Sequence, residues 1–85
     1  MSKQKLFDKL RNNQKNVRFY DFTSLVKAFG FKFDRSRGSH HMYKHLGVQK
    51  IINIQDGGGK AKPYQIRQFL TLVRDFNLQM REKDA

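Results

Sequence analysis

The sequence predicts a small α+β domain in which a three-stranded antiparallel sheet is covered on one face by helices. Apolar residues recur with the helical period before Gly30 and again after Pro63, and they alternate with a period of two between these points. A chain of 85 residues buries only about 60% of its unfolded surface on folding. We therefore expect one domain, with the eight phenylalanines supplying much of its core.

Two amphipathic helices with a complete apolar stripe are expected. The first lies in "YDFTSLVKAFG", where Asp21 suits the positive end of a helix and Gly30 stands where a left-handed residue would end it. The second begins at Pro63, a residue that fits the first helical position, and continues through "PYQIRQFLTLVRDFNL". The stripes at i, i+3, i+4 and i+7 are Phe22, Leu25, Val26 and Phe29, and then Ile66, Phe69, Leu70 and Val73, which Phe76 extends.

A third, shorter helix is expected near the N-terminus. In "KQKLFDKLRNN", Leu6 and Leu10 are four residues apart and Phe7 lies beside them. We expect a single domain over residues 1–85, with no internal repeat. Its parts are a helical extension at 1–16, a core at 17–78 and a frayed tail at 79–85.

Three short strands with tight connections are expected between the two longer helices. They lie in "FKFDR", "SHHMYKH" and "VQKIINIQ", with Gly38 and Gly47 marking the turns. The following "DGGGKAK" is expected to be a flexible loop. Two helices can cover only one face of such a sheet, so the other face is expected to be open to a ligand.

The net charge of +11 is unevenly distributed. Residues 1–62 carry 14 Lys and Arg against four Asp, whereas residues 63–85 carry four basic residues against three acidic ones. A basic field of this kind recruits polyanions, nucleic acid first and acidic proteins or anionic membranes second. The alternative is a solvated face that only keeps the protein soluble.

Composition also indicates the compartment. There is no Cys, so neither a disulfide framework nor a thiolate metal site is available, and the chain is compatible with a reducing cytosol. No apolar run approaches the roughly 20 residues that span a bilayer, and the N-terminus lacks the apolar region of a secretory signal. We therefore expect a cytoplasmic protein.

All three histidines lie in the predicted second strand. Alternation puts His40 and Lys44 on one side with Met42, and the other side carries His41, Tyr43 and His45. Both sides include an apolar residue, so the pattern leaves open which side is buried. A metal site needs several converging ligands, and no Cys or nearby carboxylate completes a set, so no metal or other cofactor is expected.

A single histidine is enough for acid–base chemistry on RNA. An unperturbed imidazole titrates near pH 6.5, and RNA supplies its own 2′-hydroxyl as the nucleophile. Arg35, Arg37 and Lys44 flank the histidines and could stabilise the charge that develops on the phosphate. The alternative, which residue types alone favour, is a hydrogen-bonded structural histidine.

The glycine-rich segment lacks the Ser or Thr of a nucleotide-binding loop, since Ala61 follows Lys60. Its amides, with Lys60 and Lys62, precede a helix and could hold a nucleic-acid phosphate. The alternative is a mobile connection between the sheet and the helix.

The run "LVKAFGFKFDRSRGSHHMYKH" resembles the HicA family of toxins, and the resemblance extends over about residues 17–78. It implies a double-stranded-RNA-binding-like fold and a metal-independent endoribonuclease that acts on mRNA and is held inactive by a HicB antitoxin. By this resemblance His40, which Gly38 and Ser39 precede, is the catalytic residue. We expect Gly38 and Ser39 to shape the approach to it. The RNA backbone is then expected to contact Arg35, Arg37, Ser39, Lys44, Lys60 and Lys62.

The sequence also departs from the commoner family pattern. The last strand lacks the histidine of Val-Pro-x-His, and the final helix starts with Lys-Pro-Tyr-Gln in place of Gly-Thr-Leu. The second catalytic group would then be Tyr43, Lys44 or a group of the substrate. The alternative function is a non-catalytic module that recognises RNA by shape.

Overall fold

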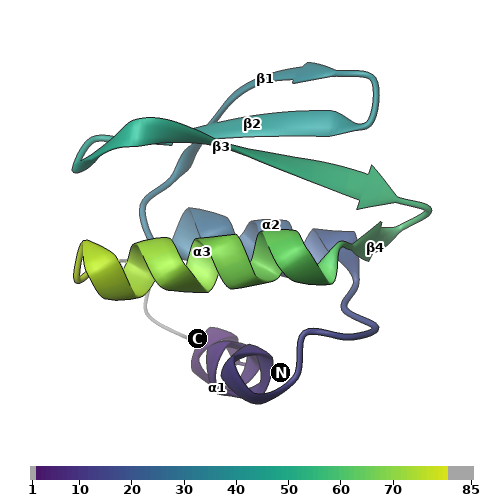
Figure 1. The fold of residues 1–85 in the computed structure, drawn as a ribbon, viewed down its shortest axis with the longest axis horizontal. Coiled ribbons are helices and arrows are strands. Elements are labelled where there is room, and N and C mark those ends of the chain that lie inside the picture. Colours follow the sequence, from purple (N-terminus) through teal and green to yellow (C-terminus); the bar gives the residue numbers. More distant parts are fainter. Residues whose placement is uncertain (1, 81–85) are drawn as a thin grey trace.

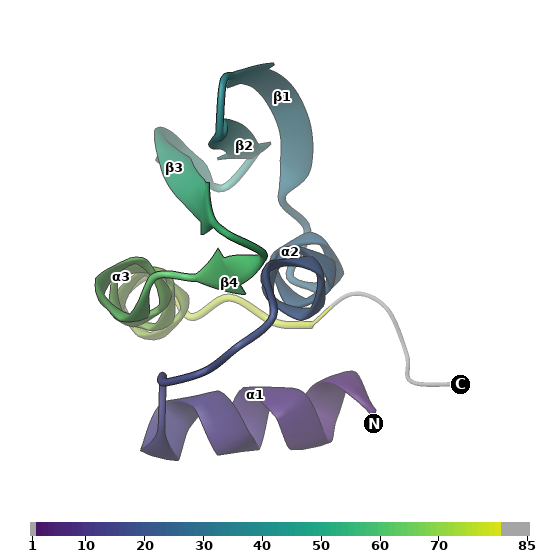
Figure 2. The same cartoon turned by 90° about the vertical axis from the view of Figure 1, so that its right-hand side faces the viewer.

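The sheet, two helices that cover it and the N-terminal helix form three successive layers in the computed structural model, which describes residues 2–80. The sheet is antiparallel with strand order β1-β2-β3-β4. Helices α2 and α3 lie against one face, and α1 lies on the far side of them (Figures 1 and 2). The elements are α1 (Lys3–Asn12), α2 (Phe19–Ala28), β1 (Lys32–Arg37), β2 (His40–His45), β3 (Val48–Gly57), β4 (Lys60–Ala61) and α3 (Pro63–Asp75).

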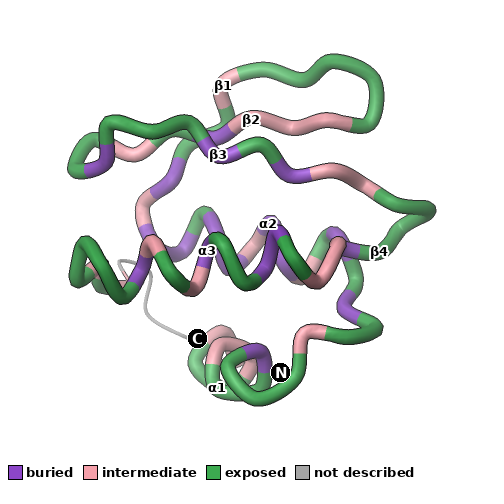
Figure 3. Tube along the Cα trace, viewed as in Figure 1, coloured by how far each residue is buried: buried purple, intermediate pink, exposed green. Residues whose placement is uncertain are grey.

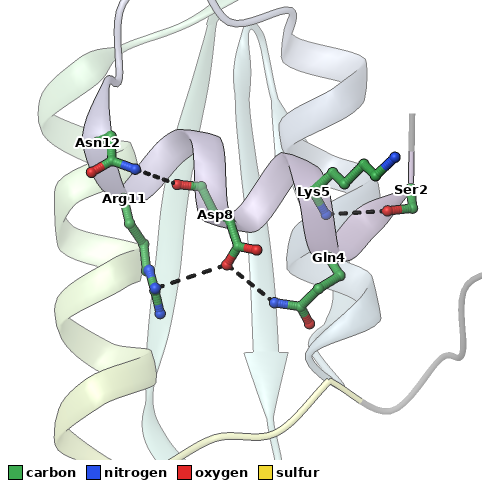
Figure 4. Close-up of polar contacts among 6 residues, drawn as sticks. All are labelled: Ser2, Gln4, Lys5, Asp8, Arg11 and Asn12. Atoms are coloured by element: carbon green, nitrogen blue, oxygen red, sulfur yellow. Dashed lines mark hydrogen bonds and ion pairs between the residues drawn. The ribbon is translucent and has the colours of Figure 1, made fainter.

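Helix α1 is capped and carries a polar outer surface. The Ser2 hydroxyl oxygen accepts a hydrogen bond from the backbone N–H of Lys5 at 3.2 Å, which satisfies one of the free donors of the first turn. Asp8 accepts from the Gln4 side chain at 3.2 Å and lies 3.8 Å from the Arg11 guanidinium (Figure 4). Exposed contacts of this kind contribute only about 0.2–0.5 kcal/mol each, so packing must hold the helix in place.

The other side of α1 is apolar and packs on the helical layer. Leu10 has no exposed surface, and the ring of Phe7 lies 4.9 Å from that of Phe29. Phe29 contacts Phe69 of α3 at 5.5 Å, and Phe69 also packs edge-on against Phe22 of α2 at 5.6 Å. A continuous set of aromatic contacts therefore joins all three helices.

The apolar stripes of α2 and α3 face the core, and the stripe predicted for α2 is confirmed at all four positions. Gly30 follows the helix with a φ of 93°, as expected for its end. In α3, Ile66, Phe69 and Val73 are buried and Leu70 is half-buried. Phe76 does not extend the stripe: it caps the end of the helix and is 43% exposed.

Two bulges interrupt the pairing of β1, β2 and β3. Phe33 pairs with Tyr43 and Arg35 with Met42, so Asp34 is an additional residue in β1. The second bulge falls between Tyr43 and His45. Side chains that face the helices include those of Tyr43, Ile52 and Ile54, which are buried. None of the helices within residues 2–80 covers the opposite face, and much of the β1–β2 hairpin is exposed (Figures 1 and 3).

The glycine-rich segment forms a hairpin, where the sequence predicted a flexible loop. Its pairs are Asp56 with Ala61 and Gly57 with Lys60. Gly58 and Gly59 make the turn with φ of 66° and 88°, a region that glycine adopts without strain. The linker after α1 pairs with the hairpin: the N–H of Ala61 donates to the carbonyl of Val17 at 2.8 Å. Strand β4 thus lies between the first turns of α2 and α3 (Figure 2).

The predicted fold class is confirmed. The domain is α+β, with an antiparallel sheet and helices on one face, and it is compatible with a double-stranded-RNA-binding-like fold that has an additional N-terminal helix. The fourth strand is the difference from the prediction. The division at residues 16 and 78 stays a prediction, and residues 81–85 of the expected tail lie outside the described residues. Within residues 2–80, no helix is both long and apolar enough to cross a membrane.

Candidate functional site on the open face of the sheet

One end of the open face holds three polar side chains in a row. The register pairs Arg37 of β1 with His40 of β2, and His40 with Gln55 of β3. Directly paired residues point to the same side of a sheet, with Cβ atoms about 4.5–5.5 Å apart. In the register His40 therefore stands between Arg37 and Gln55, and we call Arg37, His40 and Gln55 the polar row.

The turn before His40 is held against the neighbouring strand. Gly38 has a φ of 59°, and a Cβ added there would meet no atom within 4 Å, so backbone conformation rather than packing favours glycine. The carbonyl of Ser39 accepts a hydrogen bond from the N–H of Asp56 at 2.9 Å. The role expected for Gly38 and Ser39 in shaping the approach to His40 stays a prediction.

His40 is half-buried and has one side-chain partner among the described residues. Its Nδ1 lies 3.1 Å from the side-chain oxygen of Asn53. Asn53 pairs with Met42 in the register, so it is diagonal to His40 and points to the same open face. The imidazole is thus attached to β3 through one of its two nitrogens.

The other two histidines face the helices. The His41 ring packs against Phe19 at 4.9 Å. Both nitrogens of His45 are used: Nδ1 accepts from the N–H of Gly47 at 2.9 Å, and Nε2 lies 3.0 Å from the carbonyl of Phe29. A ring whose Nδ1 accepts must carry its hydrogen on Nε2, so His45 donates to Phe29 and has a structural role. The alternation predicted for this strand is therefore seen, with His41 and His45 on the covered side.

Asp34 binds two of the cations that were expected to contact RNA. Its carboxylate lies 3.1 Å from the Lys44 ammonium and also contacts the Arg35 guanidinium. The hydrogen bond from Lys44, supported by the positive charges of Lys44 and Arg35, holds the pKa of Asp34 below its usual value, although desolvation opposes this shift. Arg35 and Lys44 are therefore partly neutralised within the protein.

The other cations that were expected to contact RNA differ in whether their charged groups already bind another residue of the protein. The Lys60 ammonium donates to the side-chain oxygen of Asn16 at 2.9 Å, so it also stabilises the linker between α1 and α2. The side chain of Lys62 passes over Gly57, where an added Cβ would lie 3.7 Å from Lys62 Cε. Arg37 is exposed and makes no side-chain hydrogen bond or ion pair with another described residue. Arg37 is thus available to an anion at the polar row.

Neither protein group suggested as a second catalyst lies beside His40. Tyr43 is only 3% exposed and faces the helices, and burial raises the pKa of its hydroxyl. Lys44 is on the open side but four residues along the strand, which is roughly 13 Å at about 3.3 Å per residue. The Lys44 ammonium binds Asp34, and the side-chain contact of His40 is with Asn53 rather than with Tyr43 or Lys44.

Asn53 and Gln55 are the two site residues that sequence reasoning missed. Both belong to a strand that was predicted, but neither has a charge, and their relation to His40 depends on the register between β2 and β3. The signal that could have found them is parity: once His40 is paired with Gln55, every second residue of β3 faces the same side.

The fold and this face define a class of protein: a small α+β domain with one sheet face covered by helices and the other open and basic. Residues 19–74, from the start of α2 into the last turn of α3, match a family described as the HicA toxin of bacterial toxin–antitoxin systems. The match spans more than half of the chain, so the protein belongs to the HicA toxin family, as the resemblance predicted. The chain has no significant match among curated proteins or solved structures.

Membership of this family carries two consequences. The protein is of a toxin family, and a toxin–antitoxin system implies an antitoxin as its partner. Helix α1 lies outside the matched residues, although it packs on elements that lie within them. The additional helix is thus attached to the face of the helical layer that points away from the polar row (Figure 1).

Proposed function

We propose that the protein is an endoribonuclease toxin that cleaves mRNA without a metal, with His40 as the general acid/base. The observation that carries this proposal is the placement of the three histidines. His40 alone among them lies on the open face, and it is paired with the exposed Arg37, whereas His41 and His45 face the helices. Among the histidines, only His40 is positioned to meet a polyanion on that face.

The chemistry requires only the RNA and these side chains. A neutral His40 accepts the proton of a 2′-hydroxyl, the 2′-oxygen attacks the adjacent phosphorus, and the bond from phosphorus to the 5′-oxygen breaks. The products are a 2′,3′-cyclic phosphate and a 5′-hydroxyl whose proton comes from water, and the imidazolium returns its proton to solvent. Arg37 stabilises the charge on the phosphorane, the intermediate in which negative charge accumulates.

The RNA backbone follows the cations of the open face and the adjacent hairpin. Arg37 belongs to the polar row, and the side chain of Lys62 crosses Gly57, two residues beyond Gln55. The proposed RNA-binding set also includes three further cations and the hydroxyl of Ser39 in the turn before β2. The three cations are Arg35, Lys44 and Lys60. Such phosphate contacts position a nucleic acid without reading its sequence.

The antitoxin in this proposal is of the HicB type and brings an acidic surface to the basic one. The net charge of +11 on 85 residues supports electrostatic attraction of such a partner. The same charges would serve RNA, so the two would compete for the open face.

The test is cleavage of a labelled single-stranded RNA by wild type, His40→Gln and His41→Gln, in EDTA. A positioned acid/base contributes about 10²- to 10⁴-fold in rate. We expect the wild type to yield a 2′,3′-cyclic phosphate, His40→Gln to lose this factor, and His41→Gln, the same change on the covered side, to keep its rate. Circular dichroism checks that each variant is folded.

Two results would contradict the proposal. Undiminished cleavage by folded His40→Gln would remove His40 from the mechanism. Tight, salt-dependent RNA binding by wild type with no cleavage would instead identify a non-catalytic RNA-binding module.

A further inference from the structure

The contact between His40 and Asn53 determines which nitrogen of the imidazole carries the hydrogen. The Asn53 atom that faces the ring is the amide oxygen, 3.1 Å from His40 Nδ1. An amide oxygen only accepts hydrogen bonds, so Nδ1 must be the donor. In the neutral ring the lone pair then resides on Nε2, the nitrogen that can take a proton.

We propose that Asn53 is a positioning residue that locks His40 in the Nδ1–H form and leaves Nε2 as the base on the open face. The inference rests on the proposed ribonuclease function for its catalytic meaning. Asn53 is one of the two neighbours of His40 on β3 that the register identifies, and it is the one with a hydrogen bond to the ring. This role does not require Asn53 to touch RNA.

A neutral amide suits this role because the contact survives the proton transfer. When Nε2 takes the 2′-hydroxyl proton, Nδ1 keeps its hydrogen and still donates to the same oxygen. A carboxylate at this position would also fix the ring, but its charge would stabilise the imidazolium, so that a smaller fraction of the rings would be in the neutral form that can act as a base. The amide therefore orients the ring without adding a negative charge to a face that must attract phosphates.

The backbone of β3 supports this geometry. The N–H of Gln55 donates to the side-chain oxygen of Gln65 in α3 at 2.7 Å, and the N–H of Asp56 donates to Ser39 at 2.9 Å. Gln65 is buried, so the strand is tied to the helical layer two residues from Asn53. The acceptor that His40 uses is thus carried by a strand segment fixed on both edges.

The experiment combines nitrogen-15 NMR of the histidine rings, at a pH where they are neutral, with cleavage kinetics. The variants are Asn53→Leu, which removes the acceptor at similar volume, and Asn53→Asp, which keeps it and adds charge. Gln49→Leu is the control, because it removes an exposed amide from the same strand away from the polar row. His40→Gln assigns the His40 ring signals.

We expect the wild-type and Gln49→Leu proteins to show His40 with hydrogen on Nδ1 and Asn53→Leu to lose this preference. Its kcat should fall about tenfold, the order expected for losing one neutral hydrogen bond, with KM nearly unchanged. Asn53→Asp should restore the Nδ1–H form, and the acidic limb of its pH–rate profile should move up by about one pH unit, because the imidazolium becomes harder to deprotonate.

The NMR measurement tests the role of Asn53, and the cleavage assay tests the proposed ribonuclease function. A wild-type His40 ring with its hydrogen on Nε2, or a tautomer unchanged in Asn53→Leu, would overturn the role of Asn53 whatever the activity. Absence of RNA cleavage by wild type would overturn the ribonuclease assignment, and the NMR result would still decide whether Asn53 fixes the ring.

Discussion

His40 and His45 are the same residue type on the same strand, yet their hydrogen bonds give them different chemistry. Both nitrogens of His45 have backbone partners, at Gly47 and Phe29, so the ring has no free lone pair for a substrate. His40 has one side-chain partner, which leaves a nitrogen for chemistry. Strand parity predicted the two sides, but it could not identify the covered one, because Met42 and Tyr43 are both apolar enough for a core.

Asp34 is the residue whose removal should strengthen RNA binding. Asp34→Asn frees Lys44 and Arg35 from their ion pairs, so the affinity for single-stranded RNA should rise. The slope of log K against log salt should steepen by about 0.7 for each cation that then contacts a phosphate. Fluorescence anisotropy in a His40→Gln background measures binding without cleavage.

Asp8→Asn is the matched control for this charge change. Asp8 also pairs with an arginine, but it lies on α1, on the side of the molecule away from the sheet (Figures 1 and 4). An equal rise in affinity in both variants would mean that net charge, rather than the two released cations, controls binding.

The sign of the pH dependence at Asp34 follows from its lowered pKa. A carboxyl group whose pKa is lower in the folded state than in the unfolded state contributes stability above the ordinary value near pH 4, and this contribution is lost as the pH falls through the folded value. Replacing Asp34 by Asn should therefore leave acid unfolding less dependent on pH in that range.

At the scale of the elements, α1 is held by packing rather than by its polar contacts. Leu10→Ala removes a fully buried side chain and should lower the free energy of unfolding by about 2–5 kcal/mol. Leu46→Ala makes the same change at a residue that is 94% exposed and should stay within about 0.5 kcal/mol of wild type. Urea denaturation followed by circular dichroism measures both.

The cleavage rate of folded Leu10→Ala should match that of wild type, since α1 lies on the far side of the helical layer from the polar row (Figure 1). If Leu10→Ala lowered the free energy of unfolding no more than Leu46→Ala does, α1 would not be part of the cooperative core.

Helices and the meander could be predicted because each has a local signal, a period of 3.6 or 2. Strand β4 could not, because it has only two residues and the edge that β3 leaves open is paired with a linker far away in the sequence. The bulge at Asp34 has no local signal either, and it helps to place this carboxylate beside Lys44. Asn53 could not be assigned a role for a similar reason, because its position next to His40 depends on the register between β2 and β3.

For the whole molecule, the balance of free and paired cations should set the salt dependence of RNA binding. Arg37 and Lys62 alone would give a slope near −1.4 on single-stranded RNA, and contacts by all five predicted cations would give about −3.5. We expect a measured slope within these limits, from anisotropy titrations with His40→Gln. A slope near −7 would mean that RNA contacts most of the basic surface rather than the open face.

The Lys60 ammonium of the β3–β4 hairpin binds Asn16, which lies 44 residues earlier in the linker after α1. During translation, α1 and α2 leave the ribosome before the hairpin and α3 that complete their surroundings. A chain ending at residue 62 already contains His40, but it lacks Phe69, the ring on which α2 and Phe31 pack. Contacts this distant in sequence carry a loop-closure cost that slows folding. We therefore expect nascent chains to lack the proposed ribonuclease activity until synthesis is nearly complete.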